Sequence, residues 1–175
     1  MSEDQAWGKP DLASRLTEDH HQSLRLWLRM LSCSMKIENE IRSRLRARFG
    51  ITLPRFDLMA QLERHPQGLR MGELSKRMMV TGGNVTGIAS QLEREGLVRR
   101  TADPRDGRAF GISLTPAGRR AFGDMARVHE QWVIELLQDV PDEDKADLMA
   151  LLTRMKGHLD ARQEAVPDGA DQSPI

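Results

Sequence analysis

Residues 81–108, TGGNVTGIASQLEREGLVRRTADPRDGR, constrain the fold of this chain more than any other stretch. Apolar residues first recur at helical spacing, at Val85, Ile88, Ala89 and Leu92. After Gly96 the spacing becomes that of two short β-strands, LVRRTA and AFGISLT, on either side of the turn-rich sequence DPRDGR. The chain is therefore expected to place a short amphipathic helix directly before a β-hairpin.

The side of this helix opposite the apolar residues has almost no bulk, because Gly83, Gly87 and Ser90 lie there. Glycine inside a helix costs roughly 1 kcal/mol relative to alanine, so these residues either ease packing or let another molecule approach the backbone. A short helix, MGELSKRMM, and a turn, VTG, precede it, which is the pattern of a helix-turn-helix whose second helix enters the DNA major groove. The residues expected to contact DNA there are Thr81, Gly82, Gly83, Asn84, Thr86, Gly87, Ser90, Gln91 and Arg94.

The hairpin is rich in cations. Five arginines fall within 15 residues: Arg94, Arg99, Arg100, Arg105 and Arg108. An arginine at the tip of such a hairpin can enter the narrow minor groove beside the helix, and we expect Arg105 and Arg108 to contact DNA. Asp103 and Asp106 are interpreted as ion-pair partners that fix the loop, with Arg108 as their partner. The alternative is a solvated charged hairpin with no ligand.

The flanking sequence predicts further helices. The first ends near Phe49-Gly50, the second begins at Pro54 and ends at residues 65–68, and two more begin at Thr115-Pro116 and at Pro141. The predicted fold is mainly α with a small β-hairpin wing. Its parts are a flexible tail (1–18), a dimerisation and effector-site helix (19–50), a winged helix-turn-helix lobe (51–114), C-terminal dimerisation helices (115–163) and a second flexible tail (164–175).

Charge is unevenly distributed along a chain whose 26 basic and 26 acidic residues give a net charge of zero. Residues 70–120 hold ten Lys or Arg against five Asp or Glu, whereas residues 139–175 hold four against nine. An anionic partner should therefore dock on the middle of the chain. The single cysteine excludes an internal disulfide framework, and neither a membrane span nor a signal peptide is evident, so a cytoplasmic location is expected.

Over about residues 24–160 the sequence resembles the MarR family of winged-helix bacterial regulators. The resemblance is strongest in LPRFDLMAQLERHPQGLRMGELSKRMMVTGGNVTGIASQLEREGLVRR and in DPRDGRAFGISLTPAG. It implies an obligate homodimer formed by the first and last helices, with one recognition helix and one wing per subunit. Many members carry a third basic residue where Gly107 stands, which bears on which arginine reaches the groove.

The first helix and the last two carry more apolar surface than a compact winged domain can hide, which independently favours a dimer over an internal helical bundle. A two-fold dimer would bind double-stranded DNA at an imperfect palindrome. A rival interpretation is a helical protein-interaction module whose basic hairpin binds an acidic protein.

The resemblance also implies a repressor released by a small molecule bound between the dimerisation helices and the DNA-binding lobe. Candidate effector residues combine aromatic groups with cations: Trp27, Arg29, Cys33, Arg55, Phe56, Met59 and Trp132. Such a set suits an aromatic acid or its coenzyme A thioester. The stretch WLRMLSCSMKIENEIRSRLRARFGITLPRFDLMAQLERHP resembles the branch answering hydroxycinnamoyl-CoA thioesters, in which Arg42, Arg44, Arg46 and Arg48 would serve the nucleotide phosphates. The alternative is that the apolar members are core and the arginines form structural ion pairs.

Cys33, followed by serine, is also similar to the thiol of the hydroperoxide-sensing branch. That branch uses tyrosines to support the thiolate, and this chain contains none, so an inert cysteine is favoured. The spacings of His20, His21, His65, His129 and His158 define no metal site. No phosphate-binding loop or nucleophile motif is present, so neither an enzyme nor a bound cofactor or metal is expected.

Overall fold

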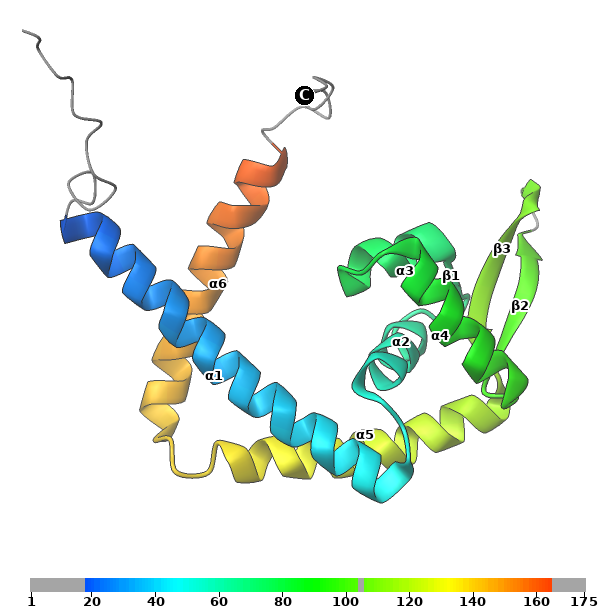
Figure 1. The fold of residues 1–175 in the computed structure, drawn as a ribbon, viewed down its shortest axis with the longest axis horizontal. Coiled ribbons are helices and arrows are strands. Elements are labelled where there is room, and N and C mark those ends of the chain that lie inside the picture. Colours follow the sequence, from blue (N-terminus) through cyan, green and yellow to red (C-terminus); the bar gives the residue numbers. More distant parts are fainter. Residues whose placement is uncertain (1–17, 104–105, 165–175) are drawn as a thin grey trace, which may run out of the picture. The chain divides into compact units, whose positions relative to one another are not determined.

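The computed structural model describes residues 18–103 and 106–164, which form two compact units that meet in the sequence at Glu130 and Gln131. Six helices and three short strands follow in the order α1 (Glu18–Phe49), α2 (Leu53–Glu63), β1 (Leu69–Arg70), α3 (Met71–Met78), α4 (Gly82–Arg94), β2 (Val98–Asp103), β3 (Asp106–Leu114), α5 (Pro116–Leu136) and α6 (Asp142–Glu164) (Figure 1). The predicted fold class, mainly α with a β-hairpin wing, is confirmed.

The core of the first unit draws apolar side chains from α1 to α5 and from all three strands. Its largest fully buried side chains are Leu45, Leu58, Met59, Leu62, Leu74, Val85, Leu92, Ile112 and Leu114. Each fully buried aliphatic side chain of this size contributes about 1.5–3 kcal/mol to folding. The α2 helix supplies three of these residues, which makes it the central helix of the unit.

Aromatic contacts join α2 to the first part of α5. The ring of Phe56 lies 5.3 Å from the ring of Phe122 and 4.9 Å from that of His129, measured between centroids. Partial burial lowers the pKa of His129, because desolvation disfavours its charged form. Packing against Phe56 thus favours the neutral form of the imidazole.

The sheet is antiparallel, with strands in the order β1-β3-β2. Val98 faces Leu114 and Thr101 faces Gly111, and a bulge between Ala102 and Asp103 shifts the register toward the hairpin end. The sequence did not predict β1, because two residues are too few to show alternation. This strand joins the wing to the segment between α2 and α3.

Helix starts agree with the sequence to within one or two residues. The α2 helix begins at Leu53 rather than Pro54, with Thr52 as N-cap, and α6 begins one residue after Pro141. The predicted cap of α5 is confirmed, since the Gly118 N–H donates to Thr115 Oγ1 at 3.0 Å.

Both units leave large apolar side chains in contact with solvent. In α1 these are Leu24, Leu26, Trp27, Leu28, Leu31, Met35 and Ile37. In the second unit they are Ile134, Leu148, Met149, Leu151, Leu152 and Leu159. No helix in the described part of the chain is long and apolar enough to cross a membrane.

Candidate nucleic-acid interface

The α3 and α4 helices are joined by a tight turn of three residues, Met79 to Thr81. Met79 adopts the left-handed conformation (φ 54°), and its side chain is 92% exposed. Ser75 closes the turn, because its hydroxyl donates to the Val80 carbonyl at 2.5 Å and its own carbonyl accepts the Val80 N–H at 3.2 Å. The prediction that this turn contains a glycine is therefore wrong, because Gly82 is the first residue of α4. Met79 takes the left-handed position instead, which is costly for a residue with a side chain.

The two sides of α4 differ as the apolar spacing predicts. Val85, Ala89 and Leu92 are fully buried against the first unit, and Ile88 is half-buried. The opposite side is exposed at Gly83, Asn84, Thr86, Gly87, Gln91 and Arg94, while Ser90 is half-buried. The residues expected to contact DNA thus lie on the outer surface of α4.

Within the part of the chain that the structure describes, the glycines of α4 have no role in packing. A Cβ atom at Gly82, Gly83 or Gly87 would meet nothing within 4 Å beyond the local helix backbone. None of the three has a positive φ, so no turn requires them. Alanine would fit at all three positions and would favour the helix by roughly 1 kcal/mol at each interior site. Packing and turn geometry therefore do not explain these residues.

The N-terminus of α4 is suited to an anion. Thr81 is the N-cap residue, but its hydroxyl makes no capping bond, and the first turn contains no acidic side chain. The Thr86 hydroxyl donates back to the Gly82 carbonyl at 2.9 Å. The first-turn N–H groups and the positive end of the helix dipole are thus left without a capping side chain and can interact with an anion.

Several arginines of the basic segment are used within the protein. Arg100 of β2 lies 3.1 Å from a carboxylate oxygen of Glu93 and donates to Ser90 Oγ at 3.0 Å, which ties the wing to α4. Arg94 Nε donates to the Ser90 carbonyl at 3.3 Å, and Arg99 Nε to Ser113 Oγ at 3.4 Å. The contacts of Arg100 orient the helix and hairpin relative to each other, whereas those of Arg94 and Arg99 lie within α4 and within the hairpin.

The tip of the wing lies beyond what the structure describes. Arg105 falls between the described ranges, and the side chains of Asp103, Asp106 and Arg108 fall outside them. The expected ion pair within the wing and the expected groove contact of Arg105 therefore stay predictions.

The C-terminal end of α4 is fastened to the start of α5. Gly96 has a φ of 71°, and the Leu97 N–H donates to the Leu92 carbonyl at 2.9 Å, as in a Schellman motif. The Thr115 hydroxyl donates to the Gly96 carbonyl at 2.7 Å. A Cβ atom at Gly118 would lie 1.9 Å from the Leu97 carbonyl oxygen, so only glycine fits there. These contacts fix the end of α4 from two directions.

The expected effector residues do not gather at one place in the first unit. Phe56 and Met59 are buried in the core, which agrees with the alternative interpretation of the apolar members. Trp27, Arg29 and Cys33 are exposed on α1, and Trp132 lies in the second unit. Arg55 forms an ion pair with Glu95 and lines a cavity of about 370 Å³ that includes none of the other six.

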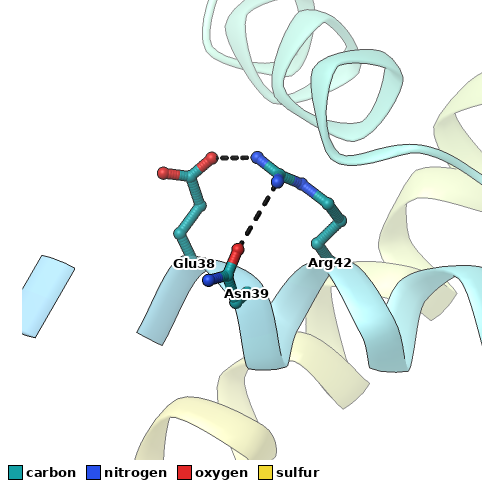
Figure 2. Close-up of polar contacts among 3 residues, drawn as sticks. All are labelled: Glu38, Asn39 and Arg42. Atoms are coloured by element: carbon teal, nitrogen blue, oxygen red, sulfur yellow. Dashed lines mark hydrogen bonds and ion pairs between the residues drawn. The ribbon is translucent and has the colours of Figure 1, made fainter. Parts of the chain in front are cut away.

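Two of the arginines expected to serve nucleotide phosphates have partners on their own helix. Arg42 pairs with Glu38 and donates to Asn39 Oδ1 at 3.5 Å (Figure 2). Arg44 pairs with Glu40 at 2.7 Å. Desolvation, with a smaller contribution from the charge of Glu38, raises the pKa of Asp57 on α2 to about 6. This part of α1 is thus acidic as well as basic, which does not favour a dedicated phosphate site.

In both sequence and fold the chain is similar to a known family of regulators. The model of the MarR family matches residues 49–109, which include α2, the helix-turn-helix and most of the wing. A crystal structure of a MarR family transcriptional regulator from Silicibacter pomeroyi is 33% identical, with a TM-score of 0.71 over 82% of this chain and 99% of that one. The chain belongs to the MarR family.

Other members are more distant. The MarR-family chain is 29% identical to the HTH-type transcriptional regulator YdgJ of Bacillus subtilis over 110 residues, which are 63% of this chain and 66% of that protein. The S. aureus MepR–DNA complex contains a chain of 25% identity, with a TM-score of 0.64 over 77% of this chain and 96% of MepR. That structure shows MepR, a protein of similar fold, bound to DNA.

Proposed function

We propose that this MarR-family chain is a dimeric, sequence-specific DNA-binding transcriptional regulator that inserts α4 into the major groove. The observation that carries the proposal is the outer side of α4. Its glycines are exposed, helical in conformation and unnecessary for folding, so they are best explained by close approach of another molecule. Small residues on a groove-facing helix let the backbone come near base edges, while Asn84 and Gln91 offer amide groups for base recognition. The MepR–DNA complex supports DNA as that molecule.

The wing supplies the second contact in this proposal. Arg105 at the tip of the wing enters the adjacent minor groove. Arg108 contacts the DNA backbone or supports Arg105. The excess of five positive charges over residues 70–120 makes the affinity sensitive to salt, because each phosphate contact releases counterions. Base preference then arises mainly from α4, and non-specific affinity from the cations.

The apolar surface of α1 and of the second unit supports the homodimer. Trp27, Leu28 and Leu31 recur at helical spacing and stay exposed in a single chain, with 54% of Trp27 accessible. Burying such surface in a second copy stabilises by about 25 cal/mol per Å². A two-fold dimer presents two α4 helices to half-sites about one DNA turn apart, or a multiple of it, so the operator is an imperfect palindrome.

The regulator is proposed to act as a repressor that a small aromatic ligand releases from DNA. The family resemblance supports an aromatic acid or an aryl-CoA thioester, and Trp27 and Arg29, both exposed on α1, offer an aromatic ring and a cation to such a ligand. The hydroxycinnamoyl-CoA branch is the more specific form of this proposal. The arginines of α1 that pair with neighbouring carboxylates weaken it, since those pairs compete with nucleotide phosphates.

Fluorescence anisotropy tests the core of the proposal. The full chain is titrated onto labelled DNA from immediately upstream of its own coding sequence and onto a shuffled duplex of equal composition, at several salt concentrations. We expect tighter binding to the upstream DNA and a steep fall in affinity with salt. Equal, weak binding to both duplexes at every salt concentration would remove DNA recognition from the proposal.

Thermal unfolding tests the effector. Aromatic acids and their coenzyme A esters are screened at equal concentration, and a ligand present at 100 times its Kd should add about 2.7 kcal/mol to the free energy of unfolding. The same compounds are then added to the protein–DNA complex. Absence of any shift across the acids and the esters would contradict the aromatic-effector part while leaving DNA binding intact.

A further inference from the structure

Met79, in the turn between α3 and α4, is an isolated apolar side chain on the surface of the first unit. It is 92% exposed, more than any other large apolar side chain that the structure describes. From residue 51 to residue 125, the described side chains include no other exposed large apolar group. The remaining exposed apolar groups lie on α1 and in the second unit, which form the proposed dimer surface. Met79 belongs to neither, so the proposed dimer does not account for its exposure.

The backbone at Met79 is also unfavourable for a methionine. The residue directly follows α3 and has a φ of 54°. The Val80 N–H donates to the Ser75 carbonyl at 3.2 Å, and the Met79 N–H donates to that of Lys76 at 3.3 Å. These bonds close the end of α3 in the manner that usually places a glycine here. Glycine would take this conformation without a steric penalty and would expose no apolar surface, so folding alone favours glycine at this position.

The surroundings of Met79 suit a polyanion. Lys76 and Arg77, in the last turn of α3, are exposed. Thr81, two residues after Met79, begins α4 as an N-cap without a side-chain hydrogen bond, and the first turn of α4 contains no acidic residue. Along the chain, Met79 thus lies between two cations and the positive end of a helix dipole. A partner for this surface should carry negative charge and also present an apolar group.

The major groove of DNA meets both requirements. Phosphates flank it, and the C5 methyl group of thymine is the apolar group that the base edges present there. We propose that Met79 packs on the C5 methyl group of a thymine in each half-site and so contributes to the choice of operator. The contact rests on the proposed function, because it needs α4 to enter the major groove. It adds an apolar contact to the amide groups that Asn84 and Gln91 offer.

Deoxyuridine tests the contact directly, because it differs from thymidine only in lacking the C5 methyl group. Each thymine of the upstream duplex is replaced in turn by deoxyuridine, and the affinity of the full chain is measured by anisotropy. At one or more positions in each half-site the replacement should weaken wild-type binding about fourfold, the contribution of one buried methyl group. At one of these positions the replacement should not affect Met79→Gly, which has no side chain to contact the methyl group.

Further variants separate an apolar contact from a structural role of Met79. Met79→Leu keeps an apolar side chain and should keep the deoxyuridine effect. Met79→Gln has a similar length but a polar end, so it should lose the effect. Met79→Gly should melt no lower than the wild type, because glycine favours the left-handed conformation. Asn84→Ala is the matched control, since it should weaken DNA binding and still show the deoxyuridine effect at the same position.

Two results would overturn the Met79 contact while leaving DNA recognition intact. One is specific binding by the wild type that no deoxyuridine replacement weakens. The other is a deoxyuridine effect of equal size in the wild type, Met79→Gly and Met79→Gln at every sensitive position. Equal binding of the wild type to the upstream and shuffled duplexes would instead contradict the proposed function, and the Met79 contact with it.

Discussion

The glycines of α4 and the glycine at the start of α5 occupy opposite environments. Gly83 and Gly87 face open space, where a methyl group would touch nothing. Gly118 packs so closely on Leu97 that a Cβ atom would lie 1.9 Å from a carbonyl oxygen. The first two lower the stability of their helix for no benefit to the fold, and the third is required by it. A residue that costs stability and packs against nothing points to a function outside the chain.

The largest effect is expected on DNA binding, from a substitution at the open site of Gly83. Gly83→Leu should leave the fold intact, because the position is open, but should block entry of α4 into the groove. Specific affinity should fall to the non-specific level, a loss of about 4 kcal/mol or more. Anisotropy with the upstream duplex measures the loss, and a melting temperature no lower than that of the wild type is the control. Normal affinity would show that this side of α4 does not face DNA.

The second effect concerns the fold. Gly118→Ala places a Cβ atom against the Leu97 carbonyl group. This clash should destabilise the protein by about 3 kcal/mol, near the upper end of overpacking costs. For a chain of this size that corresponds to a fall in melting temperature of roughly 6–12 °C. Thermal denaturation followed by circular dichroism provides the measurement. Gly123→Ala in the same helix, where a Cβ atom meets nothing within 4 Å, is the matched control and should not destabilise.

A smaller effect is expected at the wing. Arg105→Ala should weaken binding to the upstream DNA by about 1–3 kcal/mol without changing dimerisation or melting temperature. Anisotropy and sedimentation velocity give the two readouts. Arg127→Ala on α5, whose partner is the exposed Asp124, removes the same charge and should leave DNA affinity nearly unchanged. Equal effects of the two substitutions would mean that Arg105 acts only through net charge.

The smallest effect has the opposite sign. Gly87→Ala should raise stability by about 1 kcal/mol, or roughly 2–4 °C in melting temperature, since alanine favours a helix and the site is open. The same substitution should reduce DNA affinity. A variant that is both more stable and fully active would contradict the view that this glycine is kept for close approach.

The sequence predicts the regular elements well, because their signals are local. Apolar spacing identifies the buried side of α4, and Thr115 before Pro116 identifies the cap of α5. Contacts between distant segments are less accessible. No pattern indicates that Leu69-Arg70 pairs with β3, and none indicates that Arg55 meets Glu95, which lies 40 residues away.

The candidate sites show the same limit. The residues of α4 that are expected to contact DNA follow from one helical wheel, and the structure places them on the outer surface of the helix, with Ser90 half-buried. Met79 was missed because methionine gives no sign of a left-handed conformation. The effector residues are predicted from their chemical type. Chemical type alone does not distinguish Met59, which has no exposed surface, from Trp27, which is more than half exposed.

The way in which α4 is held has a consequence for engineering. Its position depends on its inner side, on Arg100 and on the Thr115 hydroxyl at its C-terminal end. Asn84, Thr86, Gly87 and Gln91 take no part in this attachment to neighbouring elements. Changes at Asn84, Thr86 and Gln91 should therefore alter the preferred DNA sequence while the scaffold stays the same, whereas Gly87 should stay small. The chain is thus a suitable starting point for libraries of altered-specificity variants.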